Sequence, residues 1–163
     1  MPNPLNEIQY ITGDATAPQV SGNKIIVHIC NDIGAWGKGF VLAISKRWPA
    51  PEAAYRKWYA EREKNDFTLG SVQLVQVEPE FYVANLIGQH DITRKGKTDD
   101  PPIRYDAVEA GLKKLAEIAP PLQASVHMPR IGCGLAGGKW EMIEPIILRT
   151  LIANGIAVSV YDF

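Results

Sequence analysis

Apolar and polar positions alternate along the chain in a way that divides it into short strands and helices. Residues 25–30 form a nearly uninterrupted apolar run, which is typical of a strand covered on both faces in the middle of a sheet. Residues 7–12 alternate, and residues 72–78 and 81–87 are separated by only two residues, which favours a hairpin. Residues 125–128 and 156–161 predict the two remaining strands.

Helical spacing of apolar residues separates these strands. The expected helices cover residues 40–48, 52–64, 105–119 and 142–154. Pro51 suits the start of the second helix, and we expect Pro120 and Pro121 to end the third. We expect Pro145 to lie in the first turn of the fourth helix, because proline cannot donate a hydrogen bond in a helix interior.

The order of these elements predicts the fold class. Helices interleaved with strands indicate a layered α/β fold, and the hairpin indicates a mixed central sheet. Residues 89–102 are polar and charged, and we expect them to form a mobile loop. No composition shift marks a linker, so we expect one domain over residues 1–163.

Composition narrows the classes of function. The chain has 163 residues, of which 46% are hydrophobic, and its formal net charge is −1. These values argue against a disordered chain and against a general nucleic-acid binder, although a local basic patch stays open. No apolar run approaches the roughly 18 residues of a membrane span, so we expect a soluble, cytoplasmic protein with no membrane partner. We also expect a monomer. Cys30 and Cys133 lack zinc-site spacing, and we expect free thiols.

Two glycine-rich loops are the candidate binding features. Gly34, Gly37 and Gly39 follow the 25–30 run and precede a helix, and residues 132–138 form a second loop before another helix. Glycine lets a backbone approach a ligand closely, and the free N–H groups of a helix start attract anions. The pattern favours a phosphate or diphosphate held by the loops rather than by a basic patch; the alternative is an ordinary strand-to-helix turn. The spacing matches neither a P-loop nor a dinucleotide fingerprint.

Four stretches carry a resemblance to a known family. They are Thr12-Gly-Asp14, His28-Ile-Cys-Asn31, Gly34-Ala-Trp-Gly-Lys-Gly39 and Met128-Pro-Arg-Ile-Gly-Cys-Gly-Leu135. In this order they resemble the macrodomain family over nearly the whole chain. The similarity is greatest to the branch of the yeast-type ADP-ribose 1″-phosphate phosphatase and the terminal ADP-ribose protein glycohydrolase. The resemblance implies a layered α/β/α fold that binds ADP-ribose, a derivative, or an ADP-ribosylated macromolecule.

The resemblance also implies roles for residues. Asp14, with the Ala15 backbone, would bind adenine, and Asn31 would bind the distal ribose; the alternatives are a turn-capping aspartate and a loop-bound asparagine. Phe163 or Tyr161 would flank adenine, or else belong to the core. The implied contact set is Asp14, Ala15, Asn31, Gly34, Ala35, Trp36, Gly37, Lys38, Gly39, Phe40, Gly132, Cys133, Gly134, Leu135, Ala136, Gly137 and Phe163.

Two members of this set have open alternatives. Trp36 is either a lid over the ribose or a packed loop aromatic. Cys133 is either a thiolate nucleophile or, as we expect, a backbone N–H donor to the ligand.

The sequence leaves open whether the domain is an enzyme. Gln89 and Ala136 occupy the positions of the lysine and aspartate used in the glycohydrolase branch, and Lys95 and Lys97 lie some residues further on. An amide forms no covalent sugar intermediate, so that mechanism does not transfer directly.

His28 and Asn31 are the catalytic candidates of the phosphatase reading. We expect His28 to exchange protons near its usual pKa of roughly 6.5, unless it is a bonded core histidine. His90 and Asp91 follow a strand end, and they either reach the same pocket or lie in a solvated loop. The first hypothesis is therefore a metal-independent, cofactor-free ADP-ribose 1″-phosphate phosphatase. The alternatives are a non-catalytic reader of ADP-ribose and a hydrolase that removes ADP-ribose from protein or nucleic acid.

Overall fold

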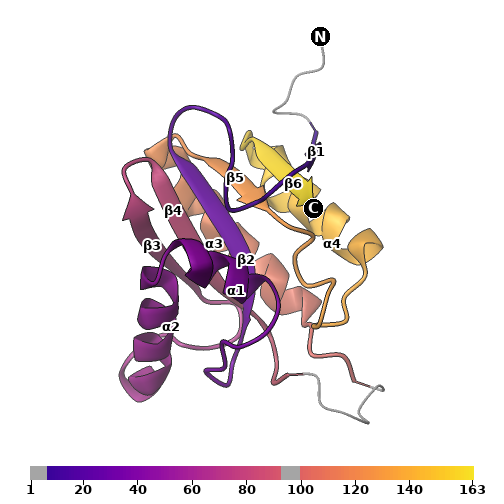
Figure 1. The fold of residues 1–163 in the computed structure, drawn as a ribbon. Coiled ribbons are helices and arrows are strands. Elements are labelled where there is room, and N and C mark those ends of the chain that lie inside the picture. Colours follow the sequence, from indigo (N-terminus) through magenta and orange to yellow (C-terminus); the bar gives the residue numbers. More distant parts are fainter. Residues whose placement is uncertain (1–6, 93–99) are drawn as a thin grey trace.

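A six-stranded sheet forms the centre of the computed structural model, which describes residues 7–92 and 100–163 (Figure 1). The strand order is β1-β6-β5-β2-β4-β3. The strands are β1 (Gln9–Thr12), β2 (Lys24–Asn31), β3 (Val72–Glu78), β4 (Phe81–Gln89), β5 (Ser125–Met128) and β6 (Val158–Asp162). Only the β3–β4 pair is antiparallel among these described strands. The predicted hairpin and mixed sheet are therefore confirmed.

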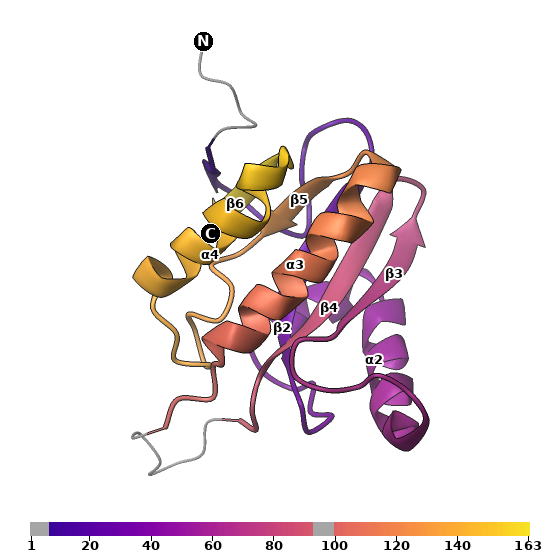
Figure 2. The same ribbon diagram turned by 180° about the vertical axis from the view of Figure 1, so that it is seen from behind.

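Helices cover both faces of the sheet. They are α1 (Phe40–Arg47), α2 (Ala50–Ala60), α3 (Tyr105–Leu122) and α4 (Trp140–Thr150), with short 3₁₀ turns at Arg62–Lys64 and Ile152–Asn154. Figure 1 shows α1 and α2 on one face, and Figure 2 shows α3 and α4 on the other. This arrangement confirms the layered α/β/α fold. No helix in residues 7–92 or 100–163 is long and apolar enough to cross a membrane.

The central strand β2 separates two hydrophobic cores. Ile25 and Val27 pack in the core beneath α3 and α4, whereas Ile26 and Cys30 pack in the core beneath α1 and α2. Side chains alternate between faces along a strand, so His28 shares the face of Ile26 and Cys30. The almost complete burial of β2 confirms the prediction of a strand covered on both sides.

Three helix boundaries differ from the sequence prediction. Helix α3 continues through Pro120 and Pro121 to Leu122, so both prolines lie exposed in its last turn and the helix ends one residue after the second of them. Helix α4 begins at Trp140, which places Pro145 in its second turn rather than its first. The second helix ends at Ala60 and is followed by a 3₁₀ turn.

The polar stretch 89–102 is only partly described. Gln89 ends β4 and forms an isolated antiparallel bridge with Ile103. Residues 93–99, including Lys95 and Lys97, lie outside the described residues, so the expectation of a mobile loop stays a prediction there. Both cysteines are free, as expected.

Gly111 provides a test of the packing between α3 and β4. A Cβ at this position would lie 2.4 Å from Cγ of Leu86, which is fully buried. Ala in place of Gly normally stabilises a helix interior by about 1 kcal/mol. We expect the opposite for Gly111→Ala, a net loss of about 1–2 kcal/mol in the free energy of unfolding, because the overpacked core must shift. Urea titration measures the difference, with the exposed Glu117→Ala on the same helix as the control. A stabilised Gly111→Ala protein would contradict the packing.

Candidate functional site

Five parallel strands end at one edge of the sheet, and the candidate site lies along that edge. Gly13 follows β1, Pro129 follows β5 and Phe163 follows β6, while Asn31 and Gln89 end β2 and β4. Open α/β sheets bind ligands in the crevice at the carboxyl ends of their strands. All five residues line cavities in this structure.

Three adjoining cavities form one groove. The first, of about 590 Å³, is called here the Asp14 end and is lined by Gly13, Asp14, Ala15, Thr16, Phe40, Ala43, Lys46, Arg47, Pro129, Tyr161 and Phe163. The second, of about 330 Å³, is the groove centre and shares Phe40 and Pro129 with the first. The third, of about 430 Å³, is the Asn31 end. It shares Ile29, Lys38, Val41, Gln89 and Leu135 with the centre.

The glycine loops border the centre and the Asn31 end. The centre is lined by His28, Lys38, Gly39, Gly132, Gly134, Leu135 and Ala136, among others. The Asn31 end is lined by Asn31, Ala35, Gly37, Lys38 and Ile92, among others. Most of the predicted contact set therefore lies along one continuous surface.

At the Asp14 end, the aspartate has a structural role as well as a place in the lining. Its Oδ1 accepts hydrogen bonds from the backbone N–H of Thr16 at 2.8 Å and from the Thr16 hydroxyl at 2.7 Å. This is the capping turn that the sequence left open as the alternative. Tyr161 is buried and Phe163 is fully exposed, and both line the same cavity.

Asn31 is held by a network centred on Tyr55. Its Oδ1 accepts hydrogen bonds from the backbone N–H groups of Ile33 and Ala35 and from the Tyr55 hydroxyl, at 2.8–3.1 Å. Its Nδ2 donates to the carbonyl of Ala35 at 2.8 Å. The side chain therefore shapes the loop, and one of its two amide hydrogens is left for a ligand.

Trp36 and Gly34 do not line the groove, contrary to the predicted contact set. Trp36 is 5% exposed and lies in the core beneath α1 and α2, where its Nε1–H donates to Ser45 Oγ at 2.7 Å. Its ring packs edge-on against His28. Gly34 lies against the Tyr59 ring, and its N–H donates to the Tyr55 hydroxyl. The packed-aromatic alternative for Trp36 is therefore the one observed.

Cys133 and Gly137 also lie outside the lining. The Cys133 N–H donates to the Arg130 carbonyl, so it closes a turn instead of facing a ligand. Burial raises the pKa of the Cys133 thiol, which argues against a thiolate nucleophile. Gly137 donates its N–H to the Gly134 carbonyl and packs against Pro101.

Each glycine loop leads into a helix, α1 or α4, and of these two helix starts only that of α1 faces the groove. Its N-cap residue, Gly39, has a φ of 84° and provides no side-chain hydrogen bond, and the first turn contains no acidic residue. Phe40 and Val41 from this turn line the groove. Helix α4 instead begins at Trp140, outside the lining, and carries Glu141 in its first turn. The α1 start therefore has the features of an anion site, and the α4 start does not.

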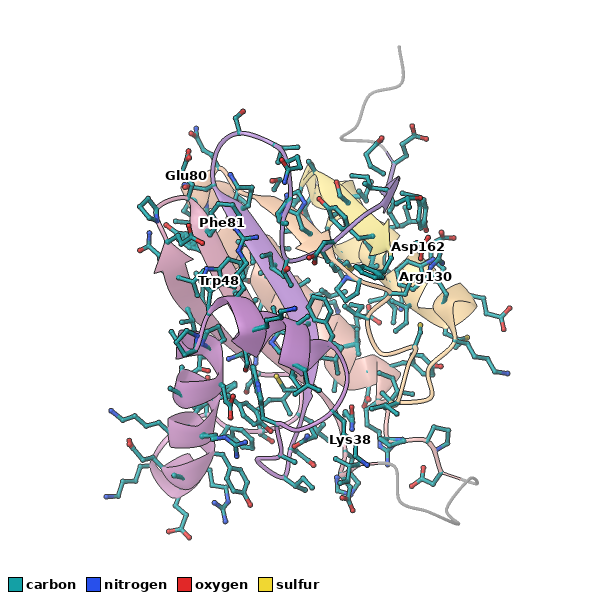
Figure 3. The ribbon with its side chains drawn as sticks, viewed as in Figure 1. Lys38, Trp48, Glu80, Phe81, Arg130 and Asp162 are labelled. Carbon is teal, nitrogen blue, oxygen red and sulfur yellow. The ribbon has the colours of Figure 1, made fainter. Side chains whose placement is uncertain are left out.

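The groove is locally basic although the chain is nearly neutral. Lys38, Lys46, Arg47 and Arg130 line it, against the single acidic lining residue Asp14 within the described residues. Arg130 pairs with Asp162 through two contacts of 2.7 and 2.9 Å, and these side chains lie together in Figure 3, away from Lys38. The expectation that no basic patch takes part is therefore not supported.

The α1 residues Ala43, Lys46 and Arg47 were missed in the sequence reading. Ala43 and Arg47 lie three and seven positions after Phe40, and Lys46 lies three positions after Ala43. Residues three or four apart share a helix face, so the helical spacing could have predicted their position beside Phe40.

His28 does not have the environment expected from its sequence position. It is 1% exposed, and burial lowers its pKa to about 4. Its Nε2 lies 2.6 Å from Asn85 Oδ1. The expectation of titration near 6.5 is therefore wrong, because removing the imidazolium from water disfavours the charged form. His28 is a neutral side chain at the groove centre.

His90 and Asp91 form contacts with Asp32 beside the Asn31 end. Asp32 Oδ2 lies 2.7 Å from His90 Nδ1, and its Oδ1 accepts the Asp91 N–H at 2.8 Å. None of the three lines the three cavities of the groove, although their neighbours Asn31, Gln89 and Ile92 line the Asn31 end. Within residues 7–92 and 100–163, no cluster of three or more His, Cys, Asp or Glu side chains is arranged to hold a metal ion.

The layered fold and this groove define an α/β protein with an extended, locally basic groove across its parallel strand ends. A macrodomain protein from Streptomyces coelicolor has a solved structure that is 56% identical, with a TM-score of 0.86, over 96% of this chain and 99% of that chain. The chain therefore belongs to the macrodomain family. No family model matches the sequence.

Curated relatives have two kinds of organisation. The chromodomain-helicase-DNA-binding protein 1-like of Danio rerio is 34% identical over 96% of this chain, but the match spans only 16% of that much longer protein. The ADP-ribose 1″-phosphate phosphatase of Meyerozyma guilliermondii is 27% identical over 96% of this chain and 99% of its own length. The second relative therefore matches this chain end to end.

Proposed function

We propose that the protein binds ADP-ribose or a derivative and hydrolyses ADP-ribose 1″-phosphate to ADP-ribose and phosphate. The observation that carries this proposal is the continuous groove whose centre meets the uncapped start of α1. The end-to-end similarity to a phosphatase of that substrate supports the reaction class.

The three parts of the groove suit the three parts of the ligand. Adenine fits the Asp14 end, between the aspartate and the aromatic rings of Phe40 and Phe163. The diphosphate fits the centre, where the α1 N–H groups and Lys38 offset its charge. The distal ribose fits the Asn31 end, within reach of the remaining Asn31 amide hydrogen.

The proposed chemistry uses neutral groups. A water oxygen attacks phosphorus and forms the new P–O bond, the bond from phosphorus to the C1″ oxygen breaks, and the C1″ oxygen takes up the proton that the water gives up. His28, which is neutral at physiological pH, acts as a hydrogen-bond acceptor that orients the water rather than as an imidazolium acid. Asn31 positions the ribose. We expect no metal or cofactor to be required.

A non-catalytic reader is the second candidate. It is favoured by the low pKa of His28 and by the use of most of the Asn31 side chain in shaping the loop. Removal of ADP-ribose through a covalent sugar intermediate has less support. Gln89 and Ala136 line the centre where that mechanism needs a lysine and an aspartate.

Phosphate release from ADP-ribose 1″-phosphate distinguishes these functions. We expect release by the wild type in the presence of a chelator, with His28→Ala reducing turnover by about 10²-fold while ADP-ribose binding is largely kept. His90→Ala is the comparison, because this exposed histidine lies outside the groove lining. Binding without phosphate release would favour the reader. Strong release of ADP-ribose from modified protein that survives His28→Ala would contradict the mechanism.

Base selectivity tests the placement of adenine. Asp14→Ala removes a charged acceptor, and we expect it to weaken ADP-ribose binding by about 1–3 kcal/mol. Asp14→Asn is the matched variant, because an amide oxygen preserves the turn with Thr16 while the charge is lost. Calorimetry should also show poor binding of GDP-ribose to the wild type. Equal affinity for the adenine and guanine forms would exclude this placement.

The glycine loops are tested by adding side chains where the fold tolerates them. A Cβ at Gly37 or Gly134 would meet no atom within 4 Å, and neither residue has a positive φ. We therefore expect Gly37→Val and Gly134→Val to fold normally but to weaken ADP-ribose binding at least about tenfold, or about 1.4 kcal/mol, by filling the groove. Ala53→Val, at an exposed position of α2, is the control. Normal titration curves for both variants would show that the loops do not contact the ligand.

A further inference from the structure

Three polar side chains lie in a row across three neighbouring strands. Gln73 on β3 is in register with Asn85 on β4, and Asn85 is in register with His28 on β2. Asn85 and His28 are almost completely buried. The row therefore begins at the edge strand and ends at a residue that lines the groove centre.

The hydrogen bonds of this row have a fixed direction. The Gln73 side chain donates to the Ala54 carbonyl at 3.1 Å, and the Asn85 side chain donates to the Pro51 carbonyl at 3.2 Å. A backbone carbonyl can only accept a hydrogen bond, so the atom facing it in each side chain must be the amide nitrogen. Two carbonyls of α2 therefore orient both amides.

The orientation of the amides determines the tautomer of His28. Gln73 Oε1 accepts the second Asn85 amide hydrogen at 3.0 Å, and Asn85 Oδ1 faces His28 Nε2 at 2.6 Å. Because Asn85 Oδ1 is an acceptor, the His28 nitrogen that faces it must carry the proton. Cys30 Sγ lies 3.9 Å from the same nitrogen, too far to compete with this bond.

The other ring nitrogen of His28 is left without a partner. Nδ1 is buried and has no hydrogen-bond partner within the described part of the chain. The neutral ring with its proton on Nε2 has a lone pair on Nδ1. An unpaired buried acceptor costs about 1–3 kcal/mol, so its retention at the lining of a groove is unusual for a purely structural residue.

We propose that Asn85 and Gln73 are positioning residues that hold His28 in the Nε2–H tautomer, so that its Nδ1 lone pair, covered in this structure, is free to accept a hydrogen bond from a hydroxyl or water when a ligand displaces the side chains that cover it. This inference rests on the proposed function for the identity of the ligand. The Nδ1 lone pair repels an anionic oxygen, so the part of the groove centre beside His28 suits a hydroxyl or water, and the diphosphate belongs beside the α1 start and Lys38. Burial keeps the His28 ring neutral by lowering its pKa, whereas the hydrogen bond to Asn85 acts in the opposite direction.

Nitrogen-15 NMR of the imidazole reads the tautomer directly, independently of any activity. We expect the wild-type His28 proton on Nε2 at neutral pH, and a shift of the Nδ1 resonance when ADP-ribose is added. Asn85→Leu should release the tautomer and lower phosphate release by about 10- to 100-fold, by analogy with the loss seen when a metal-binding histidine loses its orienting partner. His127, whose two ring nitrogens contact Ser125 and Tyr161, is the internal control and should not change.

Gln73→Leu is the second variant, because Gln73 is less buried than Asn85 and its loss affects the fold less. We expect a smaller change of the same kind. A wild-type proton on Nδ1 would overturn the inference, as would an unchanged tautomer in Asn85→Leu. If the tautomer is as expected but ADP-ribose neither binds nor shifts the Nδ1 resonance, the positioning by Asn85 stands and the proposed function and ligand contact fail.

Discussion

The central position of β2 is the constraint on which the site depends. This strand pairs in parallel with β4 on one side and β5 on the other, and both of its faces are covered. A shift of the β2 register by one residue would exchange the side chains that face the two cores. Such a shift is costly, because full burial of each isoleucine or valine side chain contributes about 1.5–3 kcal/mol. The same register that fills the cores brings Asn31 to the sheet edge beside Gln89. Stability and the placement of the site therefore have one cause.

This arrangement explains the position of some groove residues more directly than that of others. Residues at or just after the end of a parallel strand, such as Asp14, Asn31 and Pro129, lie at the groove edge because these strand ends share one edge of the sheet. The two glycine loops lie at the groove edge because they are short and turn sharply at glycines with a positive φ, such as Gly39 and Gly132. The order of strands and glycines predicted the two loops, the family resemblance implied Asp14 and Asn31, and Pro129 was not predicted.

Other features depend on contacts between distant elements, which a single sequence does not reveal. Trp36 sits in a glycine loop, but Ser45 and His28 hold it in the core. His28 has ordinary neighbours in the sequence, and its low pKa comes from burial by residues of α1 and of the adjacent strands. The bonds between Asn31 and Tyr55 join residues 24 positions apart. In each case the environment of the side chain depends on residues that are distant in the sequence.

Two kinds of positive potential act in the groove: the dipole at the start of helix α1 and the charges of basic side chains. The α1 start supplies N–H groups at a rigid position, whereas Lys38 is an exposed side chain at the border of the centre and the Asn31 end. Arg130 is held by Asp162, so part of its charge is already neutralised. Local positive charge at a narrow groove can attract an anionic ligand even when the whole molecule is nearly neutral. Selectivity for one anionic ligand over another must then come from uncharged groups whose hydrogen-bond direction is fixed. The buried row of Gln73, Asn85 and His28 has this property, because two backbone carbonyls of α2 determine which of its atoms donate and which accept.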